Sequence, residues 1–256
     1  MALFFRDEAY NEGVRQAGFG RYRQLLSFYF TRWWKVNLLT VLGALPLSAG
    51  ITLSILTSSV LVLIPASLLG GAVFGPFLAG MFDAILRGLR DAPGSWKEHY
   101  RRSWRQNWKA SLLPGALLGL LTGMFAFMLF MLYSAVAAPG WGTLLPYLFS
   151  AALFLLVTTL YWPQLVLFDQ TAANRMRNAA LFTIRHLGRV ALSVLVQLIY
   201  LAAYVLFAPW TLLLVPVLGW WYILFISQFI LYDDLNAELR IEEQFAALEG
   251  DPWAGT

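Results

Sequence analysis

Three long stretches without any Asp, Glu, Lys or Arg constrain the fold more than any other feature of the chain. They cover residues 36–82, 110–168 and 190–232. A helix needs about 20 residues to cross a hydrocarbon core of about 30 Å, so each stretch is too long for one crossing and suits two. Only 12% of the 256 residues are charged, which is too few to cover a water-soluble surface. The sequence therefore predicts an all-α integral membrane protein with six transmembrane helices in three hairpins, joined by short interfacial or cytoplasmic helices.

Breaker residues inside the charge-free stretches indicate where each hairpin turns. The first turn is expected at Thr57-Ser58-Ser59, with Pro65 and Gly70-Gly71 as a competing position. The second is expected at 138–142, which reads APGWG, and the third at 208–210, which reads APW. The helices are then expected at 36–56, 60–86, 110–133, 143–167, 190–207 and 211–231.

The basic residues all lie on one side of this arrangement. Lys and Arg number 6 before the first stretch, 7 and 4 in the two loops between stretches, and 1 after the last stretch, which accounts for all 18. Basic residues that flank membrane spans stay in the cytoplasm, so both termini and both loops are predicted to be cytoplasmic. The first 35 residues carry too many charges for a cleaved signal peptide. The expected parts are an N-terminal cytoplasmic or interfacial segment 1–35, a transmembrane domain 36–232 and an acidic cytoplasmic tail 233–256.

Two segments beside the spans mix basic and aromatic residues. The first, residues 20–35, reads GRYRQLLSFYFTRWWK and ends with Trp33 and Trp34 close to the first span. This composition favours a short helix lying among the lipid headgroups. The alternative is a cytoplasmic extension of the first span with an aromatic belt at its base.

The second segment, residues 95–109, reads SWKEHYRRSWRQNWK and repeats an aromatic residue every four positions. That spacing predicts an aromatic stripe along one side of a helix, buried against the bilayer or neighbouring helices, with the intervening arginines accessible. The simpler interpretation is that the segment binds anionic lipid headgroups, at about 1 kcal/mol per basic residue. The more specific hypothesis is that it docks a partner protein. Nucleic-acid binding is not expected, because the segment adjoins a span. The stripe is Trp96, Tyr100, Trp104 and Trp108, and the arginines are Arg101, Arg102 and Arg105.

The second loop and the tail differ in charge. Residues 169–189 carry four arginines and are expected to be helical, with Asp169 or Thr171 as N-cap. The tail after residue 232 carries seven acidic residues against Arg240 alone. We expect the acidic tail to pair with the basic loops, and a basic cytoplasmic partner is the alternative.

Few side chains within the spans could carry chemistry. Asp83 lies four residues before Arg87, a spacing that predicts a local ion pair rather than a proton or substrate site. Gln197 lies in the middle of a span and is expected to form an interhelical hydrogen bond. Three further amides lie near the cytoplasmic ends of their spans and are expected to meet water: Asn37, Gln164 and Gln228.

A ridge of small residues, Gly115, Gly119 and Gly123, predicts close helix packing, either within the chain or with a second subunit. The chain has no Cys, and its two histidines, His99 and His186, have no carboxylates at metal-ligand spacing around them. Serine-nucleophile, zinc-protease and phosphate-loop motifs are not found. The sequence predicts no enzyme activity, no cofactor and no metal.

The order of several short motifs resembles the YesL-like family, six-helix membrane proteins of unknown function from Gram-positive bacteria. The resemblance implies a bacterial plasma-membrane protein linked to carbohydrate ABC importers. The apolar stretch 58–71 is longer than the usual connection in that family. The motifs are Asn37-Leu38-Leu39, Gly75-Pro76, Trp104-Arg105-Gln106-Asn107-Trp108-Lys109, Tyr161-Trp162-Pro163-Gln164-Leu165 and Arg185-His186-Leu187.

The resemblance and the lack of chemistry in the spans together favour a non-catalytic accessory subunit. It would associate with the permease subunits of an ABC-type oligosaccharide importer, since the chain lacks the EAA-type loop with which permeases themselves engage their ATPases. The alternatives are a stand-alone small-solute transporter or channel, and a lipid-handling protein that works through its basic aromatic belt. The oligomeric state does not follow from the sequence.

Overall fold

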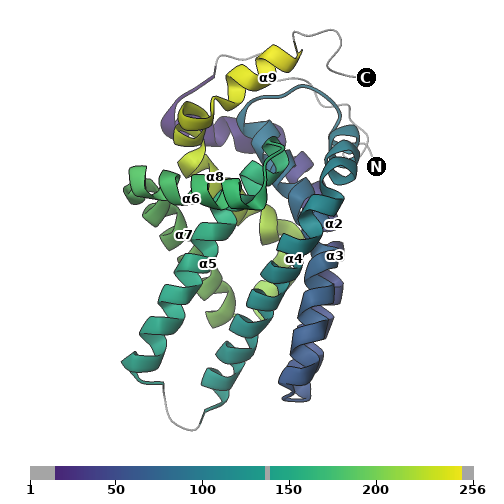
Figure 1. The fold of residues 1–256 in the computed structure, drawn as a ribbon, viewed down its shortest axis with the longest axis vertical. Helices are drawn as coiled ribbons and strands as arrows, with labels where there is room; N and C mark the ends of the chain where they lie inside the picture. The colour runs from purple at the N-terminus through teal and green to yellow at the C-terminus, as the bar shows by residue number, and fades with distance from the viewer. Residues whose placement is uncertain (1–14, 136–138, 250–256) are drawn as a thin grey trace.

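The computed structural model describes residues 15–135 and 139–249, and these residues fold into a bundle of helices (Figure 1). Six segments, counting η1 and α8 as one, are long and apolar enough to cross a membrane, which confirms the predicted all-α architecture. The elements are α2 (Gly18–Leu56), α3 (Val60–Leu89), α4 (Trp96–Ser134), α5 (Trp141–Leu167), α6 (Ala172–Arg185), α7 (Leu187–Leu206), the 3-10 helix η1 (Trp210–Leu214), α8 (Val215–Leu239) and α9 (Ile241–Glu249).

The three hairpin turns lie where breaker residues predicted them. The first turn follows Leu56, and Ser59 caps α3 by accepting a hydrogen bond from the Val62 N–H at 3.4 Å. The competing position is wrong, because Pro65 and Gly70-Gly71 lie inside α3. The second turn separates Ser134 from Trp141, and its residues 136–138 lie outside the described part of the chain.

Both segments predicted beside the spans are continuous with the spans themselves. Residues 20–35 form the first turns of α2, so the separate interfacial helix is wrong and the extension of the first span is correct. The physical reason is local: no Gly or Pro occurs between Arg21 and Leu42, so nothing breaks the helix there. Residues 96–109 likewise form the start of α4, and α8 continues past the expected tail boundary to Leu239.

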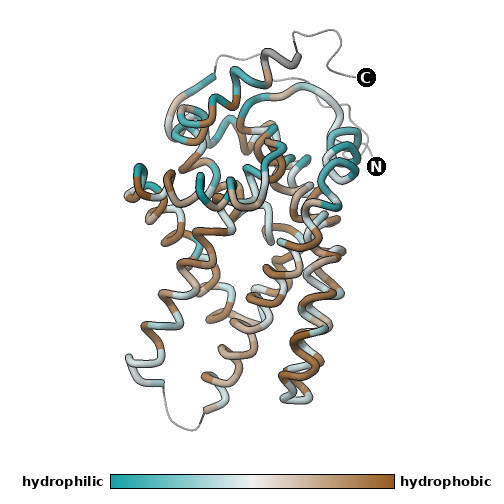
Figure 2. Tube along the Cα trace, in the orientation of Figure 1, coloured by the Kyte–Doolittle hydropathy of each residue, from teal (hydrophilic) through white to brown (hydrophobic). Residues whose placement is uncertain are grey.

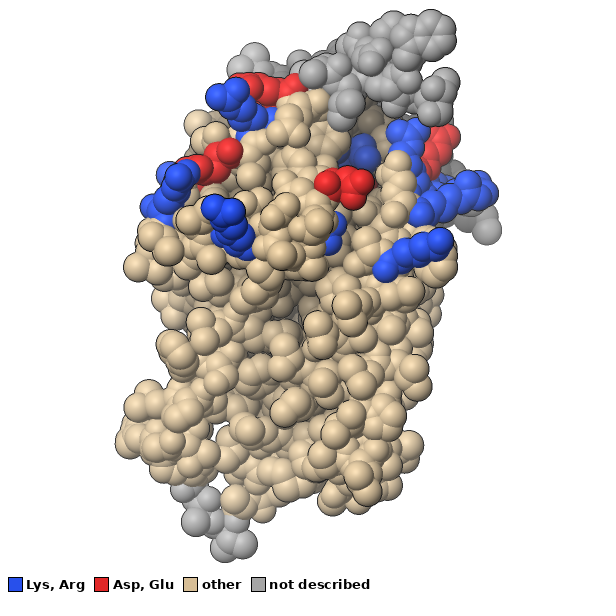
Figure 3. All heavy atoms as spheres, viewed as in Figure 1, with Lys and Arg blue, Asp and Glu red and all other residues tan. Residues whose placement is uncertain are grey.

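Charged side chains gather at one end of the bundle, near α6 and α9, and the rest of the visible face carries none (Figure 3). The same division is seen in the hydropathy of the chain trace (Figure 2). We call the end that carries Arg21, Arg87 and Arg189 the charged end, and the end that carries the three hairpin turns the uncharged end. This division confirms the predicted grouping of the charges.

The core lies toward the charged end and is rich in aromatic rings. Trp33 of α2 is fully buried, stacks on Trp221 and contacts Phe225 with ring centroids 4.6 Å apart. Its indole N–H donates to the carbonyl of Ala84 on α3 at 3.1 Å. Because α2, α3 and α8 meet around this indole, the charged half of the bundle is rigidly packed.

The glycine ridge of α4 packs against α3 within the same chain. A Cβ atom at Gly115 would lie 2.6 Å from the carbonyl oxygen of Gly71 and 2.7 Å from the Cα of Gly75. Gly119 meets the backbone of Gly71 in the same way, and Gly123 faces the side chain of Ser67. The intramolecular packing alternative is therefore confirmed, and the two backbones approach as closely as glycine allows.

Candidate functional site

The first three turns of α4 form an exposed basic surface at the charged end. Arg101, Arg102 and Arg105 are all exposed, as predicted. They project from a helix that two residues of the predicted stripe, Trp96 and Tyr100, hold against the core. Trp96 lies under the ammonium of Lys35, 5.6 Å from Nζ to the ring centroid.

The aromatic stripe divides into two halves. Trp96 and Tyr100 pack against the buried core, and the ring of Tyr100 lies where a side chain at Gly80 would otherwise be. Trp104 and Trp108 are 37% and 39% exposed, so they face outward from the bundle. The first half thus anchors the helix to α2 and α3, and the second half is available to lipid or to another protein.

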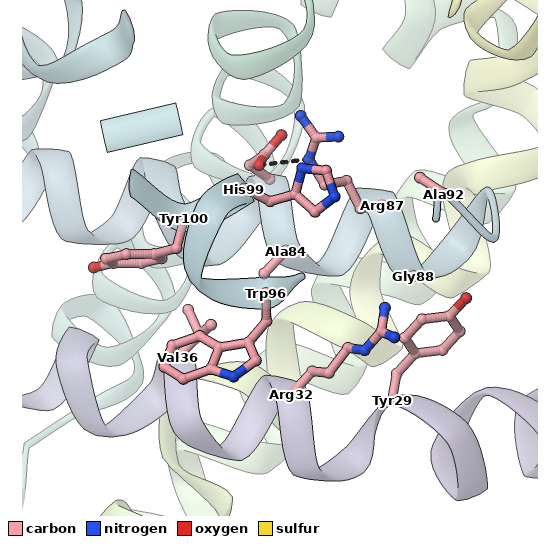
Figure 4. Close-up of a pocket in the computed structure, with 11 residues that line it drawn as sticks. Tyr29, Arg32, Val36, Ala84, Arg87, Gly88, Ala92, Trp96, His99 and Tyr100 are labelled. Carbon is pink, nitrogen blue, oxygen red and sulfur yellow. Dashed lines mark hydrogen bonds and ion pairs between the residues drawn. The ribbon is translucent and has the colours of Figure 1, made fainter. Parts of the chain in front are cut away.

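A small pocket lies between α2, α3 and the start of α4 (Figure 4). Its free volume is about 30 Å³, enough for a water molecule or two. Arg87 donates to Asp83 at 2.9 Å across one turn of α3, which confirms the predicted local ion pair. Arg32 lies over the ring of Tyr29, and His99 is 2.8 Å from the carbonyl of Pro93. The pocket is too small for a sugar and suits internal solvent.

Acidic residues of α8 neutralise the basic residues around the α6–α7 junction. Arg185 bonds Glu238 at 2.6 Å and Arg189 bonds Asp234 at 2.8 Å. His186 lies between the two carboxylates, at 3.3 Å from Asp234 and 3.4 Å from Glu238. The predicted pairing of the acidic tail with the basic loops is therefore confirmed. Of the two expected N-caps of α6, Thr171 is the one that accepts a hydrogen bond, from Asn174.

The N-terminal residues are held by two further ion pairs that sequence reasoning missed. Arg21 bonds Asp91 at 2.6 Å and also donates to the carbonyl of Leu89 at 2.9 Å. Arg15 bonds Glu242 at 2.8 Å. Burial lowers the pKa of Arg15, but this hydrogen bond together with the negative charges of Glu242 and Asp91 more than offsets burial and raises the pKa above its ordinary value. These pairs join the start of α2 to the α3–α4 loop and to α9.

The Asn37 side chain hydrogen-bonds backbone groups at a break in α8, a role that sequence reasoning also missed. The backbone of Gly219 is not helical, with φ −33° and ψ −113°. The Asn37 amide donates to the carbonyls of Val215 and Pro216 at 3.0 Å, and its oxygen accepts from the Trp220 N–H at 2.9 Å. Backbone groups freed by a break inside a membrane need such a partner. Pro216 and Gly219, three residues apart, are helix breakers, and they were the sequence signal from which the break in α8 could have been predicted.

The prediction that three amides meet water is wrong. Asn37, Gln164 and Gln228 are 0%, 2% and 0% exposed. Gln164 donates to the carbonyls of Leu160 and Arg175, and Gln228 donates to the carbonyl of Thr159. Their buried amides form hydrogen bonds that link neighbouring helices.

Gln197 behaves as predicted. Its amide donates to the hydroxyl of Thr159 on α5 at 2.9 Å and to the carbonyl of Ser193. The mid-span amides therefore act as interhelical hydrogen bonds. Within the described residues, no group of three or more His, Asp or Glu side chains is placed to hold a metal ion. Comparisons of the chain with models of protein families, with curated proteins and with solved structures give no match.

Proposed function

We propose that this protein is a non-catalytic accessory subunit of an ABC-type carbohydrate importer in a bacterial plasma membrane, with its charged end in the cytoplasm. The observation that carries the proposal is the basic surface at the start of α4, where Arg101, Arg102 and Arg105 are exposed. Several other arginines at the charged end form ion pairs with acidic residues of the same chain, among them Arg21 with Asp91 and Arg87 with Asp83. An exposed basic surface beside the membrane favours association with an acidic partner surface.

The shape of the bundle supports this assignment of the docking surface. The first turn at the uncharged end is three residues long, whereas a specific interface generally buries about 800 Å² on each partner. A stable complex therefore has to use the charged end or the lipid-facing sides of the helices. The importer as partner class rests on the YesL-like order of motifs, including Tyr161-Trp162-Pro163-Gln164 before α6.

The polar side chains of the spans support a scaffold in preference to a transporter. Asn37, Gln197 and Gln228 are buried, and their amides form hydrogen bonds that hold helices together. A transport path needs polar groups that can exchange partners with a solute. Here the same groups stabilise one arrangement of the bundle, which suits a rigid subunit that positions a partner.

The test is affinity purification from the native host in a neutral detergent, comparing two variants of equal charge change. The first replaces Arg101, Arg102 and Arg105 with Gln. The control replaces three exposed arginines elsewhere, Arg23, Arg177 and Arg240, with Gln. We expect permease subunits to copurify with the wild type and the control, and to be lost from the first variant.

Two outcomes would overturn the proposal. If the wild type is recovered without permease subunits, at native expression and after crosslinking, the proposed association with an importer is refuted. Retention of the partner by the α4 variant, with weaker binding to anionic vesicles, would overturn the docking surface on α4 and assign its three arginines to lipid anchoring.

A further inference from the structure

The turn between α7 and α8 differs in composition from the other two hairpin turns. The first turn is Thr57-Ser58-Ser59, whereas the third is Phe207-Ala208-Pro209 and is followed by the 3-10 helix 210–214, which reads WTLLL. The large apolar side chains of this third turn are strongly exposed to the surroundings of the bundle. They are Leu206 at 77%, Phe207 at 65%, Trp210 at 75% and Leu213 at 72%. Exposed apolar surface of this density is not compatible with contact to water alone.

The third turn also ends far short of the second. The hydrogen bond between Gln197 of α7 and Thr159 of α5 fixes a common level for the two helices. Beyond that level α7 continues only to Leu206, about 14 Å, whereas α5 extends back to Trp141, about 27 Å, at 1.5 Å per residue. With the two helix axes taken as roughly parallel, α5 thus reaches about 13 Å farther toward the uncharged end than α7.

The first hairpin gives the same result independently. Asn37 of α2 lies level with Val215 and Pro216, to which it is bonded. From Asn37, α2 runs on to Leu56, about 28 Å, whereas η1 adds only about 10 Å beyond Val215. Figure 1 shows the end of the α7–α8 pair above the lower ends of α3 and α5.

Several polar groups of the third turn are hydrogen-bonded to carbonyls of the turn or of the last turn of α7. The N–H groups of Ala208, Thr211 and Leu212 donate to the carbonyls of Val205, Phe207 and Pro209 at 3.0–3.3 Å. The Thr211 hydroxyl donates to the carbonyl of Tyr204 at 2.6 Å. In hydrocarbon an unsatisfied backbone group costs several kcal/mol, so this pairing is what an immersed turn requires.

We propose that the α7–η1–α8 turn ends inside the hydrocarbon of the leaflet at the uncharged end, where its exposed side chains contact lipid acyl chains. The six helices all lie in the membrane, but only the first two hairpins carry turns that reach the aqueous phase. Acyl chains fill the space beyond the third turn, between the outer halves of α2 and α5. These halves present exposed leucines toward the membrane, among them Leu53 and Leu148.

Single-cysteine spin labels can measure the depth of each turn, because the chain has no native cysteine. The third turn is probed at Leu213 and, on its other arm, at Leu206. The controls are Ser58 and Gly140 in the other two turns. Each labelled variant is reconstituted in phosphatidylcholine vesicles, and its collision rates with oxygen and with a water-soluble nickel complex are measured. Oxygen partitions into hydrocarbon and the nickel complex stays in water.

We expect high oxygen and low nickel accessibility for Leu213→Cys and Leu206→Cys, and the reverse for Ser58→Cys and Gly140→Cys. Both probe side chains are exposed, so their replacement removes little packing. An impermeant maleimide, applied to unlabelled variants, should modify the two controls in vesicles and the two probes only after solubilisation in SDS. Nickel accessibility at both probe positions equal to that at Ser58 would place the third turn in water and overturn the proposal.

Discussion

Replacing Gly115 with alanine should weaken the α3–α4 packing that holds the second hairpin to the first. The added Cβ would lie 2.6 Å from the Gly71 carbonyl oxygen, where ordinary contacts begin at 3.4 Å. Because its nearest neighbours are all backbone atoms, no side chain can move aside, and the helices must separate by roughly 0.8 Å. A gap of 0.5–1 Å forfeits about a quarter to a half of the dispersion energy of each contact across it. We expect a loss of about 1–3 kcal/mol in the free energy of unfolding.

The assay is reversible unfolding in mixed micelles, with SDS as the denaturant and tryptophan fluorescence as the signal. The matched control is Gly188→Ala, also inside a helix, where a Cβ would meet nothing within 4 Å. This control should be neutral or slightly stabilising, since alanine is the better helix former. Equal unfolding free energies for Gly115→Ala, Gly188→Ala and the wild type would refute the backbone-contact reasoning.

Three further predictions concern the polar contacts and the topology. Asn37→Leu should lower the free energy of unfolding by about 1–3 kcal/mol in the same assay, because it leaves backbone groups at the α8 break without a hydrogen-bond partner. Gln197→Leu should lower it by about 0.6 kcal/mol. A larger loss for Gln197→Leu than for Asn37→Leu would contradict the role given to Asn37. In a double-mutant cycle, Arg189→Gln and Asp234→Asn should show a coupling below about 1 kcal/mol that vanishes in 1 M salt, since Arg189 is half-exposed. A coupling that persists in 1 M salt would mean that the pair is shielded from solvent. In intact cells a cysteine at Gly140 should react with an impermeant thiol reagent, and one at Glu98 should react only after permeabilisation. Glu98 is exposed, so its replacement removes little packing. Reaction of Glu98→Cys in intact cells would reverse the orientation.

Features set by local spacing or by bilayer thickness could be predicted from the sequence. The length of a charge-free stretch fixes how many helices it can hold, and the turn at Ser59 and the cap at Thr171 depend on a few neighbouring residues. The Asp83–Arg87 pair and the glycine ridge follow from the period of one helix. Each of these needs no knowledge of which helices are neighbours in space.

Contacts between distant segments could not be predicted in the same way. Arg21 and Asp91 are 70 residues apart, and Asn37 reaches across to a break in α8 whose existence depends on tertiary packing. Periodicity placed Trp96 and Trp108 on one stripe but did not reveal where α4 leaves the bundle, so it missed the change from buried to exposed along the stripe. Burial of the three amides was missed because the depth of a residue within a bundle is set by its neighbours.

The ion pair between Arg15 and Glu242 joins residues 227 positions apart, almost the two ends of the described chain. During synthesis the arginines emerge first and insert next to the membrane, while every acidic residue that neutralises Arg15, Arg185 and Arg189 is still to be made. A chain that stops before α8 would therefore expose all of these basic groups at once. These arginines therefore gain their ion-pair partners only after α8 and α9 have been made.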